Sequence, residues 1–163
     1  MADLESSLNR ALFGRDIPTD VAGMVRELGG TREAAEALGV TQRTVQRWTT
    51  STAGQRRKPS TATVGKLSTA TRRNIAGPDR LRRLRGQGSN TVTKGEMGME
   101  ANKKSYMRDR RVTHELTPQR MQAVTTALIR GDTAKAAKSY ATAFDHNYVS
   151  GFTFGDLEYI TFD

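Results

Sequence analysis

The sequence predicts an α+β protein made of two small units. The first is all-helical, and the second combines a short antiparallel sheet with two helices. Three observations support this fold class. Apolar residues recur at helical spacing through residues 1–75. Two later segments, residues 110–116 and 157–162, alternate apolar and polar residues as half-buried strands do. The chain has 163 residues, enough for two small domains with modest cores, and it contains no cysteine.

The N-terminal domain is expected to span residues 1–75 and to begin with two helical segments. Residues 1–18 carry a short apolar pattern that predicts a minor helix. A helix should begin after Thr19 or Asp20, either of which can cap its first turn. Its apolar pattern stops at the glycine pair that begins with Gly29.

Residues 30–48 read GTREAAEALGVTQRTVQRW and predict two helices that meet at Gly39. Glycine can adopt a positive φ in this turn at no steric cost, and Thr31 and Thr41 are the expected N-caps. The pattern is that of a helix-turn-helix, which places its second helix in the major groove of DNA. The small or apolar residues expected in its core are Ala34, Ala35, Leu38, Val40, Val45 and Trp48.

The second helix of this motif carries side chains suited to DNA. Glutamine can pair with adenine and arginine with guanine in the major groove, so Gln42, Arg43 and Gln46 are the expected base-reading residues. Residues 54–60, GQRRKPS, predict a basic turn or wing, and a last helix should follow it through Arg73. The expected phosphate contacts are Thr41, Thr44, Arg47, Arg56, Arg57 and Lys58.

The formal net charge of +9 is unevenly distributed along the chain. Residues 1–41 have a net charge of −3, residues 42–85 of +11 and residues 86–163 of +1. The basic block favours nucleic acid over an anionic membrane surface, because it lacks the apolar face of an interfacial helix. Residues 76–88 are expected to be a basic linker that becomes helical on DNA, where phosphates neutralise its charges. Its expected DNA contacts are Arg80, Arg82, Arg83 and Arg85.

The C-terminal domain is expected to span residues 89–163 and to contain three strands and two helices. The strand-like segments show β-branched residues or period-two alternation, and proline is favoured at the first position of a helix. The expected elements are a strand over 90–99, a polar loop over 101–109, a strand over 110–116, a helix from Pro118 to Gly131, a helix capped by Asp132, and a strand over 157–162.

The sequence does not support intrinsic catalysis or a bound metal. His114 and His146 lie in separate elements, and there is no phosphate-binding glycine loop or dinucleotide fingerprint. We therefore expect a protein that is not an enzyme and that binds no cofactor of its own. No apolar run approaches the roughly 18 residues of a membrane span, and the acidic N-terminus has no signal-peptide pattern. These features predict a cytoplasmic protein of bacterial type with no membrane partner.

Four segments together resemble the telomere terminal proteins of actinobacterial linear replicons. They are GTREAAEALGVTQRTVQRW, the basic stretch that follows it, RRVTHELTPQRM from residue 110, and LEYITFD at residues 157–163. The resemblance covers most of the chain and excludes roughly residues 86–105. It implies a nucleoid-associated protein that becomes covalently attached to the 5′ ends of a linear chromosome or plasmid.

The resemblance also implies how this attachment occurs. In that family a threonine hydroxyl near the start of the second domain accepts the first deoxynucleotide in place of a primer. The matching residue is Thr113, and Arg110 and Arg111 are expected to attract the triphosphate or DNA. The alternation of the strand predicts that Thr113 is exposed and faces away from His114. The implied partners are telomeric DNA ends, a DNA polymerase that supplies the Mg²⁺, and a telomere-binding replication protein. The fallback acceptors are Thr117, Ser105 and Tyr106.

Two other functions remain open at this stage. One is a transcriptional regulator whose second domain dimerises or senses a ligand. A regulator of this kind predicts a homodimer on a palindromic operator with half-sites one helical turn apart. The other is a plasmid replication or partition factor that acts without a covalent step.

Overall fold

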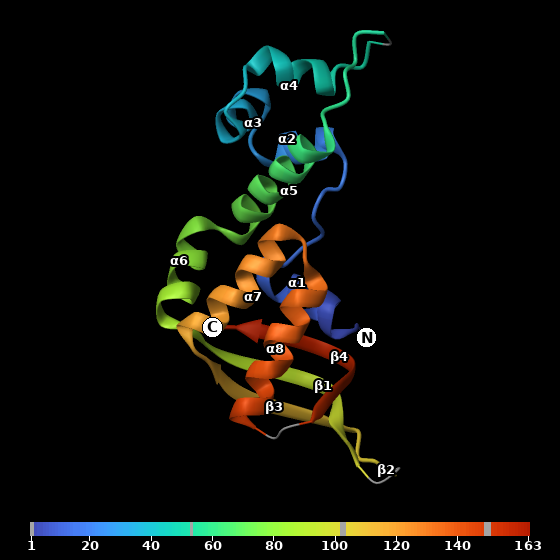
Figure 1. Cartoon of the computed structure of the whole chain (residues 1–163), viewed down its shortest axis with the longest axis vertical. Helices are drawn as coiled ribbons and strands as arrows, with labels where there is room; N and C mark the ends of the chain where they lie inside the picture. The colour runs from blue at the N-terminus through green and yellow to red at the C-terminus, as the bar shows by residue number, and fades with distance from the viewer. Residues whose placement is uncertain (1, 53, 102–103, 149–150) are drawn as a thin grey trace. The chain divides into compact units, whose positions relative to one another are not determined.

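The computed structural model contains eight helices and four strands within the part of the chain that it describes, residues 2–52, 54–101, 104–148 and 151–163 (Figure 1). These elements divide into two compact units. The helical unit spans residues 16–78, and the sheet unit combines residues 1–15 with residues 79–163. The helical unit is thus inserted into the sequence of the sheet unit. None of the helices described is both long and apolar enough to span a membrane.

The helical unit consists of α2 (Val21–Glu27), α3 (Thr31–Leu38), α4 (Gln42–Thr49) and α5 (Thr61–Ala76). Short polar side chains cap α2, α4 and α5. Asp20 accepts a hydrogen bond from the backbone N–H of Gly23, and Ser60 accepts one from Thr63. Each cap satisfies a donor that the first turn leaves unpaired. After α3 the chain turns at Gly39, whose φ of 67° is a left-handed conformation favoured for glycine.

Four of the six residues predicted to fill the core of the helical unit are buried in it, and Leu38 is partly buried against them. Val40 is an error of that prediction, since its side chain is 36% exposed. Its backbone N–H closes the turn on the carbonyl of Ala35, at 3.0 Å, and this places Val40 at the surface. Thr31 is the first residue of α3, and Gly30 occupies the predicted capping position instead. The fully formed core is Met24, Val25, Ala34, Ala35, Val45, Trp48 and Leu67.

The strands of the sheet unit are β1 (Ser89–Ala101), β2 (Lys104–Ser105), β3 (Arg108–Leu116) and β4 (Phe152–Phe162). β1 is central and pairs antiparallel with β3 and with β4, while its end pairs with β2. The prediction of a polar loop over residues 101–109 is wrong where β2 and β3 form. The backbone of Tyr106 packs against Gly98, where an added Cβ would overlap the carbonyl oxygen of Tyr106. The N–H of Tyr106 donates to the carbonyl of Met99 at 2.9 Å. Glycine thus permits the close pairing that extends this hairpin.

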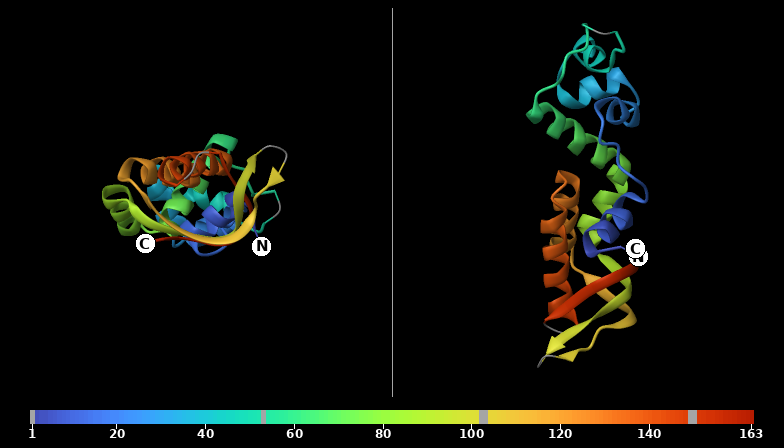
Figure 2. Two further views of the ribbon diagram at one scale, coloured as in Figure 1. Left: turned by 90° about the horizontal axis from the view of Figure 1, so that it is seen from below. Right: turned by 90° about the vertical axis from the view of Figure 1, so that its right-hand side faces the viewer.

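Helices cover one face of the sheet, as the two views in Figure 2 show. The helices of this unit are α1 (Leu4–Phe13), α6 (Pro78–Gln87), α7 (Pro118–Arg130) and α8 (Thr133–Asn147). Of these, α1 and α8 pack against the strands, and α7 packs against α1 and α8. The inward residues of β3 are buried against this layer, whereas the opposite face of β3 has only exposed side chains. The sheet therefore has one packed face and one open face, as antiparallel sheets often do.

The N-terminal helix belongs to the sheet unit, which differs from the predicted domain of residues 1–75. Leu8 and Leu12 are completely buried there. The chain before the helix joins the sheet at Leu157. The N–H of Ala2 donates to the carbonyl of Leu157 at 3.0 Å, and the N–H of Leu157 donates to the carbonyl of Ala2 at 2.8 Å. Apolar spacing predicted the helix correctly. The spacing of apolar residues within one short helix does not, however, indicate whether the helix packs in the core of the helical unit or in that of the sheet unit.

Residues 78–87 form α6 in the protein alone, which differs from the expected basic linker over residues 76–88 that becomes helical on DNA. Leu81 and Leu84 lie three residues apart and are both buried. The repulsion among the arginines is thus opposed by apolar burial, and by the pairing of Arg82 with Asp79 at 3.3 Å. Burial of these two leucines therefore favours the helix over an extended linker.

A histidine is enclosed between the sheet and α8. His114 is 6% exposed, and the rings of Tyr140 and Phe144 stand edge-on to it with centroids 5.3 and 4.8 Å away. Burial disfavours the charged imidazolium and lowers the pKa of His114 to about 4. Nearby, the hydroxyls of Tyr140 and Thr93 are hydrogen-bonded at 2.5 Å. His114 is therefore a neutral core residue at physiological pH.

We expect the sheet unit to lose stability as the pH falls from about 6.5 towards 4. The unfolded chain binds a proton on His114 near its usual pKa of 6.5, whereas the folded chain resists protonation until about pH 4. Protons thus favour the unfolded state across this interval, and the loss between pH 7 and pH 5 should be about 2 kcal/mol. Urea unfolding followed by the tyrosine near-ultraviolet signal measures this loss, because all four tyrosines lie in the sheet unit.

The matched variants for this prediction are His114→Leu and His146→Leu. His114→Leu should reduce the pH-dependent loss by most of that amount, whereas His146→Leu changes an exposed histidine and should retain the loss. An equal loss in His114→Leu and in the unaltered protein would contradict the assignment to His114.

Candidate nucleic-acid interface

The exposed face of α4 carries the side chains predicted to read DNA bases. Thr41 caps this helix by accepting a hydrogen bond from the N–H of Thr44 at 3.3 Å. The helical period then buries Val45 and Trp48 and exposes the residues between and before them. The exposed set is Gln42, Arg43, Gln46 and Arg47.

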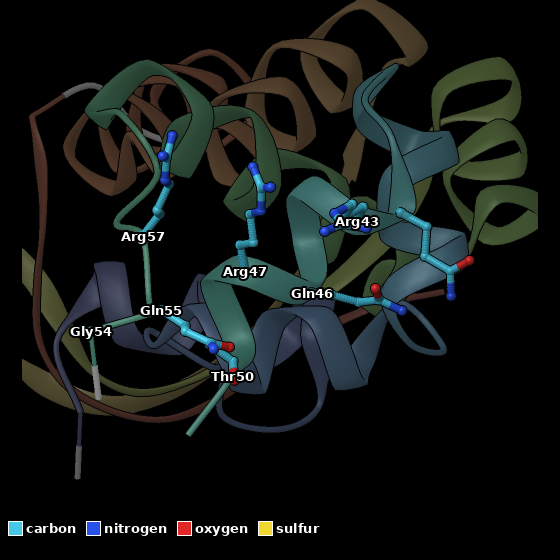
Figure 3. A pocket seen from close by; sticks show the side chains of 8 residues that line it. Arg43, Gln46, Arg47, Thr50, Gly54, Gln55 and Arg57 are labelled. Atoms are coloured by element: carbon cyan, nitrogen blue, oxygen red, sulfur yellow. The ribbon is translucent and has the colours of Figure 1, made fainter. Parts of the chain in front are cut away.

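The loop after α4 bends back and forms a hollow with the exposed face of that helix. The backbone N–H of Arg57 donates to the carbonyl of Arg47 at 2.9 Å, which holds the loop to the end of α4. The hollow has a volume of about 710 Å³, and Figure 3 shows the side chains of both segments around it. It is lined by Gln42, Arg43, Gln46, Arg47, Thr50, Gly54, Gln55 and Arg57.

This surface is strongly basic. Residues 42–58 contain five arginine or lysine residues and no aspartate or glutamate. The side chains of Arg56, Arg57 and Lys58 are all exposed, as predicted. Gln55 was not among the predicted site residues, because its place beside α4 depends on the loop conformation rather than on sequence spacing. The hollow therefore combines amide groups with positive charge.

The two predicted phosphate-binding threonines have a local role in the helix cap. The hydroxyls of Thr41 and Thr44 lie 2.9 Å apart and are hydrogen-bonded to each other. Thr41 remains exposed, whereas Thr44 is half-buried. These two hydroxyls, which were predicted to bind phosphate, are thus partly engaged in capping α4.

The arginines of α6 fall into two pairs with different surroundings. Arg80 donates to the carbonyls of Leu12 and Ala11 at 2.5 and 3.0 Å, and so binds the C-terminal end of α1. Arg85 donates to the hydroxyl of Thr125 in α7 at 2.9 Å. Both therefore hold the sheet unit together, which differs from their predicted role as DNA contacts. The exposed pair consists of Arg82 and Arg83.

Thr113 lies on the open face of the sheet, where its side chain is exposed. Its neighbours on β3, Val112 and His114, face the core and are buried. On the adjacent strands, Val92 lies directly opposite Thr113, and Thr161 lies directly opposite Val92. Thr113 is therefore exposed on the open face of the sheet, as the alternation predicted.

Two basic residues form the next row of this open face. Arg111 lies two residues before Thr113, about 7 Å along the strand, and it is paired in register with Lys94 of β1. Lys94 Nζ contacts Glu158 Oε2 at 2.6 Å, and this hydrogen bond raises the pKa of Lys94. Glu115 carries a negative charge on the other side of Thr113. Sequence reasoning missed Lys94, because its proximity to Arg111 depends on strand register.

Arg110 was predicted to act beside Arg111, but the strand directs the two side chains to opposite faces. The Nε of Arg110 donates to the carbonyl of Met97 at 3.2 Å. Its guanidinium carbon lies 5.9 Å from the centre of the Phe152 ring, close enough for a cation–π contact. Arg110 thus stabilises the packed side of the sheet, and only Arg111 shares the face of Thr113.

The fallback acceptors lie elsewhere in the sheet unit. Thr117 is exposed at the N-cap of α7, where its side chain makes no capping bond. Tyr106 is 46% exposed in the hairpin. The side chain of Ser105 lies outside the described part of the structure.

Comparison of the chain with protein-family models, with curated proteins and with solved structures finds no match.

Proposed function

We propose that this protein binds the ends of a linear replicon and primes DNA synthesis there through Thr113, becoming covalently attached to the 5′ end. The observation that carries the proposal is the position of Thr113 on the open face of the sheet, one row from Arg111 and Lys94. The proposed partners are telomeric DNA, a DNA polymerase and a telomere-binding replication protein. The protein acts as a primer rather than as an enzyme.

DNA binding is assigned to the helical unit. We infer that α3, the turn at Gly39 and α4 form a helix-turn-helix, with α4 as the recognition helix. Support comes from the buried Val45 and Trp48 on one side of α4 and the amide and guanidinium groups on its other side. Gln42, Arg43 and Gln46 would read base edges, while the basic loop over residues 54–58 would bind phosphates.

The priming step needs a free hydroxyl and an activated nucleotide. The Oγ1 of Thr113 attacks the α-phosphorus of a deoxynucleoside triphosphate and forms a new phosphorus–oxygen bond. The bond between the α-phosphorus and the bridging oxygen breaks, pyrophosphate leaves, and the hydroxyl proton passes to a base of the polymerase or to water. Mg²⁺ held by the polymerase would activate the hydroxyl and stabilise the leaving group. His114 is no candidate for the base, because it lies buried on the opposite face.

Arg111 is the charge that would favour the product of this step, because Lys94 is already paired with Glu158 and Glu115 lies on the other side of Thr113. The phosphodiester formed on Thr113 keeps a negative charge, and Arg111 and Lys94 lie one row away. Two like charges directly opposite each other on a sheet are mutually destabilising. Among the residues that the structure describes, Lys94 has a carboxylate partner, Glu158, and Arg111 has none. A phosphate group beside Arg111 would relieve this repulsion.

Thr113→Val should abolish nucleotide acceptance. Valine keeps the β-branched shape and strand preference of threonine, so the exposed position should tolerate it while the nucleophile is lost. The assay measures transfer of a labelled deoxynucleotide to the protein by its cognate polymerase on a telomeric template. Thr161→Val is the matched control, because it removes an exposed hydroxyl from the same face two strands away. Labelling should fall to background in Thr113→Val and persist in Thr161→Val.

Undiminished labelling of Thr113→Val would exclude Thr113 as the acceptor. Specific DNA binding with no labelling of the unaltered protein would instead favour a transcriptional regulator or a replication factor that acts without a covalent step.

Arg43→Ala and Arg56→Ala should weaken DNA binding in different ways. Arg43 is assigned to a base, so its loss should relax sequence preference and cost about 1 to 3 kcal/mol on the preferred site. Arg56 is assigned to phosphate, so its loss should weaken binding to all sequences. It should also reduce the slope of log binding constant against log salt concentration by about one. Titrations of cognate and scrambled duplexes at several salt concentrations measure both effects. Equal losses from both substitutions on every sequence would contradict this division.

A further inference from the structure

We propose that Thr31 positions the side-chain amide of Gln42 so that Gln42 recognises adenine and rejects guanine. This inference rests on the proposed binding of DNA by the helical unit, and it adds a specificity-determining residue that makes no base contact itself. The observation behind it is a hydrogen bond between the two side chains, in which Gln42 Nε2 donates to Thr31 Oγ1 at 3.1 Å.

The bond joins the first residues of two helices. Thr31 begins α3 and Gln42 begins α4, eleven positions later. Gln42 is exposed and lines the basic hollow, whereas Thr31 is half-buried at the start of α3. A free glutamine on a surface samples many rotamers and loses that freedom on binding. The contact with Thr31 restricts the amide before any ligand arrives.

The bond also determines which atoms of the amide remain available. A glutamine amide offers two N–H donors and one oxygen acceptor. Thr31 accepts one N–H, so a single N–H and the oxygen of Gln42 remain for a ligand. Adenine presents an acceptor at N7 and a donor at its N6 amino group in the major groove. The remaining atoms of Gln42 match that pair.

Guanine presents acceptors at both N7 and O6. To satisfy both, Gln42 would have to direct its two N–H groups at the base, and one of them is already bound to Thr31. With the amide fixed, the Gln42 oxygen would face the guanine O6, and two acceptors repel. Thr31 therefore creates discrimination against guanine without touching DNA.

The surrounding residues support a positioning role rather than a simple link between helices. The turn between α3 and α4 is already closed by the backbone, since Val40 N donates to the Ala35 carbonyl at 3.0 Å. The caps of α4 and the buried Val45 are independent of Thr31. Removing the Thr31 hydroxyl should therefore leave the fold intact while releasing the amide of Gln42.

The test compares Thr31→Val, Thr31→Ser and Gln42→Ala with the unaltered protein. Selection from random duplexes first identifies the preferred site, and anisotropy titrations then measure binding to duplexes with adenine or guanine at each position. The unaltered protein should prefer adenine by about tenfold at one position, as a matched bidentate contact predicts. Thr31→Val should reduce that preference to within about threefold of the Gln42→Ala value, and Thr31→Ser should restore it.

Three outcomes separate this inference from the function on which it rests. Full adenine preference in Thr31→Val, together with its loss in Gln42→Ala, would overturn the role of Thr31 and leave DNA reading intact. An equal loss of affinity for every duplex in Thr31→Val, not restored by Thr31→Ser, would indicate a structural role and also overturn it. A protein that selects no sequence would overturn both. The fluorescence of Trp48, the single tryptophan, reports whether each variant retains the fold of the helical unit.

Discussion

The register between β1 and β3 is the constraint on which the sheet unit depends. It pairs Val92 with Thr113 and Thr91 with His114, so that one residue faces out and the next faces in. A shift of one residue would expose His114 and bury the hydroxyl of Thr113. The same pairing brings Arg111 opposite Lys94. The accessible hydroxyl, the adjacent basic row and the buried histidine are thus results of a single alignment.

The arginines of the basic block have different roles, which their number alone does not reveal. Those in residues 43–58 remain exposed around the hollow beside α4. Arg80 and Arg85 instead satisfy carbonyl and hydroxyl oxygens within the sheet unit, at the end of α1 and on α7. Outside this block, Arg110 lies against Phe152 on the packed face. Charge composition thus overestimates the surface available to nucleic acid, because a guanidinium can also serve as a structural donor.

Local patterns in the sequence predicted local structure well. The apolar spacing and caps of α2 and α4, the alternation of β3 and the proline at the start of α7 all correspond to observed elements. The exposure of Thr113 and of the α4 side chains also followed from periodicity. Errors arose where the outcome depends on distant contacts. The core that receives α1, the burial of Leu81 in α6, the roles of Arg80 and Arg85 and the proximity of Lys94 to Arg111 all depend on tertiary pairing.

The most direct test of this account is to locate the nucleotide on the protein itself. The protein is recovered from the ends of a linear replicon, its DNA is digested with nuclease, and tryptic peptides are analysed by tandem mass spectrometry. Cleavage after Arg111 and Arg120 yields one peptide of residues 112–120, in which Thr113 and Thr117 are the only hydroxyl side chains. We predict a nucleotide mass on this peptide, with fragment ions that assign it to Thr113. A nucleotide on another hydroxyl, or protein at replicon ends with no nucleotide attached, would contradict the account.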